Sequence, residues 1–219
     1  MSSSKIARYG AIGFILNASF YLLTEFIAAL GTGYPLDYVY ARQFISALGV
    51  YNGQVVEGVP ENFSSWAIVM NIGFIVTALG FVASYLLLIF PKMKKVSKAR
   101  AYILLLIVLS FGVGSLLVGL YQGGVPGQDD LHGLGARLSF LMGNATLLLT
   151  GIFLPEKRLG YRSISIILAI VGFSAVYFLQ NAITANLENV MAIYERLTVY
   201  PITAWQFITG ITFLTKRNK

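Results

Sequence analysis

The sequence predicts an all-α, polytopic transmembrane bundle of six helices, with both termini in the cytoplasm and a short amphipathic helix in the first outer loop. Three observations lead to this prediction. Hydrophobic residues make up 57% of the 219 residues and charged residues only 11%, too few charges to cover a soluble domain. Six apolar stretches follow one another along the chain, and Lys and Arg gather between alternate stretches.

Each apolar stretch is long enough to cross about 30 Å of hydrocarbon, which takes roughly 20 helical residues. The stretches are continuous rather than alternating, so helices, whose backbone groups bond internally, are favoured over the strands of a β-barrel. No linker or charge block divides the chain, so residues 1–219 are expected to form a single domain. The predicted spans are residues 9–30, 63–89, 101–121, 134–154, 163–183 and 199–215.

The first outer loop, residues 31–62, is long for a connection inside a bundle, and loops of that length usually carry structure or function. Asp37 is a candidate N-cap for a helix that follows Pro35. Apolar residues then recur at helical spacing, which predicts a short interfacial or re-entrant helix. They are Tyr40, Phe44, Leu48 and Tyr51. One interpretation is that this helix covers the outer end of the bundle with aromatic side chains. The other is that it covers a cavity and supplies Arg42 to an anionic ligand.

The second loop, residues 91–100, holds five basic residues and sets the orientation. With the N-terminus in the cytoplasm, only Arg42, Arg137 and Arg196 of the 16 basic residues lie outside. This bias follows the positive-inside rule and predicts a multi-pass protein of the cell membrane with cytoplasmic termini. The basic residues predicted inside are Lys5, Arg8, Lys92, Lys94, Lys95, Lys98, Arg100, Lys157, Arg158, Arg162, Lys216, Arg217 and Lys219.

Acidic residues follow the opposite distribution, which explains the net charge of +7 without a nucleic-acid partner. A basic inner rim beside anionic headgroups is ordinary membrane electrostatics. We therefore expect membrane lipids as partners and no nucleic acid. Glu156 is predicted inside, and the acids predicted outside are Asp37, Glu57, Glu61, Asp129, Asp130, Glu188 and Glu195.

Glu25 is the only acid inside the predicted spans, and an ionisable group in hydrocarbon is a functional hypothesis by default. Tyr21 and Asn17 precede it at intervals of four, on the same helical face. The deep polar residues favour the outer half of the bundle, which predicts an outward-opening polar pocket. Its predicted lining is Glu25, Asn71 and Asn144, with Arg42, His132 and Arg137 near the mouth.

Two structural alternatives to this pocket stay open at the level of sequence. Asn17, Asn71 and Asn144 could serve as interhelical hydrogen-bonding groups that hold the bundle together. Glu25 could simply pair with Arg42 or Arg137, or it could stay protonated, since burial disfavours the charged form of a carboxyl group.

The third span carries small residues four apart, the small-xxx-small pattern of close helix packing. This predicts a packing interface, either in the bundle core or with a partner helix. The interface residues are Ser110, Gly114, Ser115 and Gly119.

Residues 122–133 carry the single histidine, His132, beside Asp129 and Asp130. One histidine and two acids on a loop are few ligands for a zinc site, and a haem with two histidine ligands needs a second histidine. A Ser–His–Asp triad would need a nucleophile such as Ser46 or Ser139 within reach. The simpler interpretation is that an aspartate N-caps the fourth span while His132 titrates at the surface. We therefore predict no metal, no cofactor and no catalytic residue.

Several short motifs resemble the family of six-helix membrane proteins grouped as domain of unknown function 998 (DUF998). The resemblance runs over nearly the whole chain and implies an integral membrane protein without an assigned activity. The motifs are residues 42–49 after the first span, Asn71 followed by Gly73, Gly114 to Gly119, Pro126 with His132, and residues 138–143.

Two function classes follow from the sequence. The first is a non-enzymatic membrane component that binds a lipid, a partner subunit or a second copy of itself through the outer loop and the glycine-rich third span. The second is a lipid-headgroup enzyme or a small-solute carrier that uses the outward-facing polar pocket, although inverted repeats and broken helices typical of carriers are not evident.

Overall fold

The computed structural model describes residues 3–56, 59–60, 63–154 and 159–215. Eight charged residues of the predicted charge distribution lie outside this part of the chain. They are Glu57, Glu61, Glu156, Lys157, Arg158, Lys216, Arg217 and Lys219.

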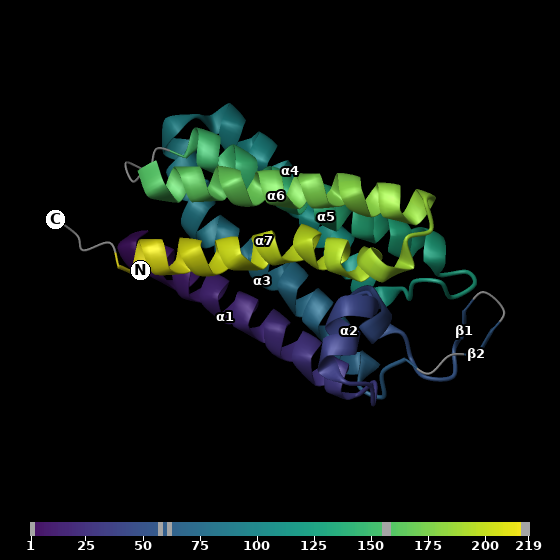
Figure 1. Cartoon of the computed structure of the whole chain (residues 1–219). Coiled ribbons are helices and arrows are strands. Elements are labelled where there is room, and N and C mark those ends of the chain that lie inside the picture. The colour runs from purple at the N-terminus through teal and green to yellow at the C-terminus, as the bar shows by residue number, and fades with distance from the viewer. Residues whose placement is uncertain (1–2, 57–58, 61–62, 155–158, 216–219) are drawn as a thin grey trace.

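Within the described residues, six helices are long and apolar enough to cross a membrane, which confirms the predicted helical membrane fold. Figure 1 shows these helices running the length of the molecule. Their lengths of 23 to 30 residues exceed the roughly 20 needed to span hydrocarbon. They are α1 (Ser3–Leu30), α3 (Ala67–Val96), α4 (Lys98–Leu120), α5 (Asp129–Phe153), α6 (Leu159–Thr184) and α7 (Glu188–Leu214).

The start of α7 differs most from its predicted position. The helix begins at Glu188, whereas hydropathy predicts a start at residue 199. Glu195 and Arg196 lower the hydropathy of the first turns, so hydropathy predicts an outer loop for both. That placement was wrong, because both side chains are buried inside the bundle.

The basic stretch of residues 91–100 is also more helical than predicted. Helix α3 continues through Pro91 to Val96, and α4 begins at Lys98, so a single residue separates the two helices. That residue, Ser97, is extended and its side chain accepts a hydrogen bond from the Arg100 backbone N–H at 3.4 Å. Ser97 thus N-caps α4 and forms the turn.

Each long helix packs against its neighbour in the chain, and α7 packs against α1 to close the arrangement. Helix α5 also contacts α7 across the interior. The start of α1 and the end of α7 lie together at one end of the bundle, and the segment between α1 and α3 lies at the other (Figure 1). We call these the terminal end and the loop end.

The loop end is covered by the segment between Leu30 and Ala67. It contains helix α2 (Leu36–Arg42), a 3-10 turn η1 (Ser46–Gly49) and two short antiparallel strands, β1 (Val55–Val56) and β2 (Val59–Pro60). The strands were not predicted. A short helix is present, but it ends at Arg42 because Gln43 is extended, so the helical spacing from Tyr40 to Tyr51 is not realised as one helix.

Among the described residues, a large apolar cluster lies in the middle and terminal half of the bundle, and a smaller one lies at the loop end. A third cluster joins α6 to α7. Three rings from three helices form the centre of the large cluster: Phe14 lies 5.6 Å from Phe81 and 5.4 Å from Trp205, between centroids. The loop-end cluster includes Val39, Ile45 and Leu48 from the covering segment. This segment is therefore packed into the fold rather than resting on it.

The predicted orientation can be tested directly because the chain contains no cysteine. We expect a cysteine at Asn52, exposed at the loop end, to react with a membrane-impermeant maleimide on intact cells. A cysteine at Ala99, exposed at the terminal end, should react only after permeabilisation. Labelling in the reverse order would show that the termini lie outside the cell.

Candidate functional site

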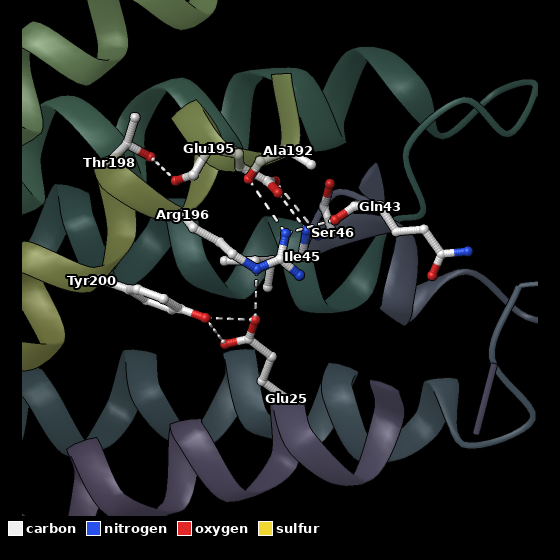
Figure 2. Close-up of polar contacts among 9 residues, drawn as sticks. All are labelled: Glu25, Gln43, Ile45, Ser46, Ala192, Glu195, Arg196, Thr198 and Tyr200. Atoms are coloured by element: carbon white, nitrogen blue, oxygen red, sulfur yellow. Dashed lines mark hydrogen bonds and ion pairs between the residues drawn. The ribbon is translucent and has the colours of Figure 1, made fainter. Parts of the chain in front are cut away.

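A buried ion pair connects α1 to α7 near the loop end. Glu25 is 1% exposed and Arg196 is 5% exposed, and Arg196 Nε lies 3.2 Å from Glu25 Oε1. The Tyr200 hydroxyl, one turn further along α7, lies 3.0 Å from Glu25 Oε1 and 3.2 Å from Oε2 (Figure 2). The predicted burial of Glu25 is confirmed, but its partner is Arg196 rather than Arg42 or Arg137. Arg196 lies roughly 12 Å along α7 from its first residue, deep for a charged group.

Glu195 is a second acid inside a span, so Glu25 is not the only one. Glu195 is 5% exposed, and its carboxylate accepts hydrogen bonds from the backbone N–H groups of Ile45 and Ser46. These two residues lie at the start of η1, in the segment that covers the loop end. A carboxylate on α7 therefore holds the covering segment in place through charge-assisted hydrogen bonds.

Arg196 holds the same segment at a neighbouring position. Its Nη1 donates to the Gln43 carbonyl at 2.7 Å and to the Ala192 carbonyl at 3.3 Å (Figure 2). The guanidinium also lies 4.9 Å from the centre of the Tyr40 ring, a cation–π distance. Burial raises the pKa of the Tyr40 phenol, and Glu25 raises it further, so Tyr40 remains neutral at physiological pH. Two adjacent residues of α7 thus fix residues 40–46.

A cavity of about 50 Å³ lies beside this network, between α1, α3, α4, α5 and α7, with Ile45 and Ser46 among its lining residues. A single water needs roughly 10–15 Å³ by a comparable measure, so the cavity has room for a few waters or a small organic group. Apolar and aromatic side chains contribute most of the surface. The lining residues that carry polar groups are Ser46, Thr77, Ser115, Ser139, Glu195, Thr203, Gln206 and Tyr21.

Two of these lining groups have hydrogen-bonding capacity that the described part of the chain does not use. The Tyr21 hydroxyl and the Thr77 hydroxyl are both buried and have no hydrogen-bond partner among the described residues. Buried polar atoms in native proteins nearly always have a partner, either protein or a bound molecule. Both residues contribute to the lining of the cavity, so a molecule bound there could supply a partner for their hydroxyls.

A family model described as "Protein of unknown function (DUF998)" matches residues 18–212. The chain belongs to the DUF998 family. The match covers most of the chain and includes all residues that line the cavity, from Tyr21 to Gln206. It confirms the resemblance predicted from the short motifs. Neither the comparison with curated proteins nor that with solved structures gave a match.

The DUF998 fold gives the predicted asparagines structural partners in the interior. The Asn71 side chain donates to the Gly49 carbonyl at 2.9 Å and so fixes the end of η1 on α3. Asn144 on α5 donates to the Thr198 carbonyl of α7 at 3.0 Å, and to Phe140 on its own helix at 2.8 Å. The bond from Asn144 to Thr198 is an interhelical hydrogen bond of the predicted kind, whereas the bond from Asn71 joins α3 to the covering segment. Neither asparagine lines the cavity.

The three residues predicted at the mouth of the pocket are not brought together either. Arg42 and Arg137 are exposed, on α2 and α5 respectively, and neither lines the cavity. His132 is 7% exposed, so the prediction that it titrates at the surface is wrong. Its Nδ1 lies 2.8 Å from the Tyr121 carbonyl, which connects the end of α4 to the start of α5.

The acidic pair in the first turn of α5, Asp129 and Asp130, differs from the prediction. The residue before the helix is Gln128, without a side-chain cap, and Asp129 accepts a hydrogen bond from the Gly124 N–H at 2.6 Å. Asp129 thus stabilises the preceding turn rather than capping the helix. Among the described residues, no group of three or more His, Cys, Asp or Glu side chains could hold a metal ion.

Three of the four predicted interface residues of α4, Gly114, Ser115 and Gly119, pack inside the bundle, whereas Ser110 is half-buried. A methyl group built on Gly114 would lie 2.6 Å from the Ser139 backbone nitrogen, and Ser115 Oγ lies 3.3 Å from Ser139 Oγ, both on α5. A methyl group on Gly119 would lie 2.9 Å from a backbone oxygen of α3. Ser110 donates to the Leu106 carbonyl of its own helix at 3.0 Å.

Sequence reasoning missed Glu195, Arg196 and Tyr200, which supply most of the network. One signal could have identified them: Arg196 and Tyr200 are four residues apart, as are Tyr21 and Glu25 on α1. Two such polar faces on neighbouring helices are expected to face each other rather than lipid.

Proposed function

We propose that this protein is a non-enzymatic membrane component that binds a small molecule, or the terminal group of a membrane lipid, in the cavity beneath residues 45–46. The unpartnered hydroxyls of Tyr21 and Thr77 are the observation that carries the proposal. Ligand sites are typically apolar cavities with a few convergent polar groups, and this cavity has that composition.

The size and the polar groups of the cavity limit the ligand. At about 50 Å³, it admits a short polar or amphipathic group and not a whole phospholipid. The ligand must donate or accept hydrogen bonds to satisfy both free hydroxyls, while its remaining surface contacts rings and aliphatic side chains. Glu195 lines this cavity and also accepts hydrogen bonds from the covering segment. A ligand that contacts the Glu195 carboxylate therefore also affects the position of residues 45–46.

The experiment that tests the proposal compares two serines on the same helix. Ser115 lines the cavity, whereas Ser110 bonds within its own helix and does not line it. We would purify the native protein, the Ser115→Leu variant and the Ser110→Leu variant in mild detergent and identify retained molecules by native mass spectrometry. Leucine at position 115 fills the cavity, so the Ser115→Leu variant should lose the bound molecule. The Ser110→Leu variant should retain it.

Equal retention in all three proteins would place the bound molecule elsewhere and contradict the proposal. A native protein that carries no small molecule but a stoichiometric second chain would also contradict it, and would indicate an accessory subunit instead. A folded protein is required for the comparison, so each variant is first checked for a single symmetric peak in size-exclusion chromatography.

A further inference from the structure

We infer that the ligand of this cavity is a small organic ammonium ion, R–NH₃⁺, and that Glu195 is its anionic partner. This inference rests on the proposed binding function and names the chemical class that the cavity selects. It follows from the rings that line the cavity, from the charge balance of the buried network and from the hydrogen-bonding character of the lining.

Aromatic rings from four helices line the cavity. They are Tyr21, Phe74, Phe111 and Phe140, on α1, α3, α4 and α5. The rings of Tyr21 and Phe74 lie 6.1 Å apart between centroids and are tilted by 56°, so they form a corner. Ring faces attract cations within about 6 Å, and this attraction grows when the cation is desolvated. Among the described lining residues there is no lysine or arginine to compete with a bound cation.

The charges beside the cavity do not balance. The network contains two carboxyl groups, Glu25 and Glu195, and one guanidinium, Arg196. Figure 2 shows that Arg196 makes its ion pair with Glu25, whereas the carboxylate of Glu195 is held by backbone N–H groups. An unpaired carboxylate is costly in a membrane interior, so a second positive charge near Glu195 stabilises its ionised form.

The lining can accept every hydrogen bond that an ammonium donates. An ammonium has three N–H donors and no acceptor. The Glu195 carboxylate oxygens and the hydroxyl oxygens of Tyr21 and Thr77 can each accept a hydrogen bond from an ammonium N–H. A cavity of about 50 Å³ suits an ammonium with a short alkyl group, either a free amine or the end of an aminophospholipid headgroup.

The test uses two probes that are similar in size and differ in charge, ethylammonium chloride and ethanol. The protein is reconstituted in nanodiscs of phosphatidylglycerol, which contains no amine, and binding is measured by saturation-transfer NMR with potassium chloride added to equalise ionic strength. We expect ethylammonium to bind at least about tenfold more tightly than ethanol, since a hydrogen bond to a charged group is stronger than one between neutral groups.

Glu195→Gln should abolish this preference, and Glu188→Gln provides the matched control. Glu188 is an exposed acid at the start of the same helix, so its replacement should leave both affinities unchanged. Glu195 also holds residues 45–46, so Glu195→Gln changes both the contact with the ligand and the position of these residues. A second variant is needed to separate the two effects. Phe140→Leu keeps the carboxylate and removes one ring, and we expect it to weaken ethylammonium several-fold while ethanol binding stays the same.

Equal affinities for the two probes, unchanged by Glu195→Gln, would overturn the ammonium inference and leave the proposed binding function intact. Equal retention of the bound molecule by the native protein, Ser115→Leu and Ser110→Leu would overturn the proposed function itself. Nanodiscs of phosphatidylethanolamine then identify the source of the amine. If the headgroup occupies the cavity, ethylammonium binding falls in these nanodiscs, and if a free amine is the ligand, it does not.

Discussion

Replacing Arg196 with methionine is expected to be the most damaging single change in the protein. The variant loses the ion pair to Glu25 and the hydrogen bond to the Gln43 carbonyl, while Glu25 remains 1% exposed with the Tyr200 hydroxyl as its donor. Removing one partner of a buried pair typically costs about 3–5 kcal/mol, because the remaining charge is buried without compensation. For a chain of this length, such a loss lowers the unfolding midpoint by roughly 10 °C or more.

The measurement is thermal unfolding in detergent, with two further variants that identify the cause. Arg137→Met removes an exposed arginine from α5 and should change the midpoint little. The double variant Glu25→Gln with Arg196→Met removes both charges and should recover part of the loss. If the unfolding midpoints of the single variant Arg196→Met and of the double variant fall equally, packing rather than buried charge explains the effect.

Gly114→Ala is expected to destabilise the protein even though alanine favours helix formation over glycine. The added methyl group would lie 2.6 Å from the Ser139 nitrogen and 2.7 Å from the Gly135 carbonyl oxygen, both backbone atoms of α5. Backbone atoms cannot rotate away as side chains do, so α4 and α5 must separate. Overpacking of this kind costs about 1–3 kcal/mol, more than the gain of up to roughly 1 kcal/mol in helix propensity.

Gly133→Ala is the matched control, since it makes the same change in α5, where the new methyl group would meet no atom of another element within 4 Å. The unfolding midpoint of this variant should be unchanged or slightly raised. The difference in midpoint between Gly114→Ala and Gly133→Ala then measures the cost of the close contact between α4 and α5. Equal unfolding midpoints for the two alanine variants would show that α4 can move away from α5 at no cost. Gly114→Leu should enlarge the effect and disturb the adjacent cavity lining at Ser115.

The sequence by itself determined the membrane fold, since 20 or more continuous apolar residues have few alternatives to a spanning helix. It also indicated that Glu25 has a role in the interior, because a lone acid in an apolar helix needs a partner. The small residues of α4 marked a close contact, although the pattern did not say whether α5 or another protein forms it.

Only the tertiary structure decided which residues meet. Hydropathy averages over a window, so Glu195 and Arg196 counted against a span. In the fold, Arg196 pairs with Glu25, and Glu195 accepts hydrogen bonds from the backbone of Ile45 and Ser46. The cavity could not be predicted for a related reason: its lining comes from five long helices and the covering segment, and the faces that line it depend on helix rotation. The sequence determines which segments enter the membrane because that depends on local composition, while the partners of buried charges depend on contacts between residues as far apart as Glu25 and Arg196.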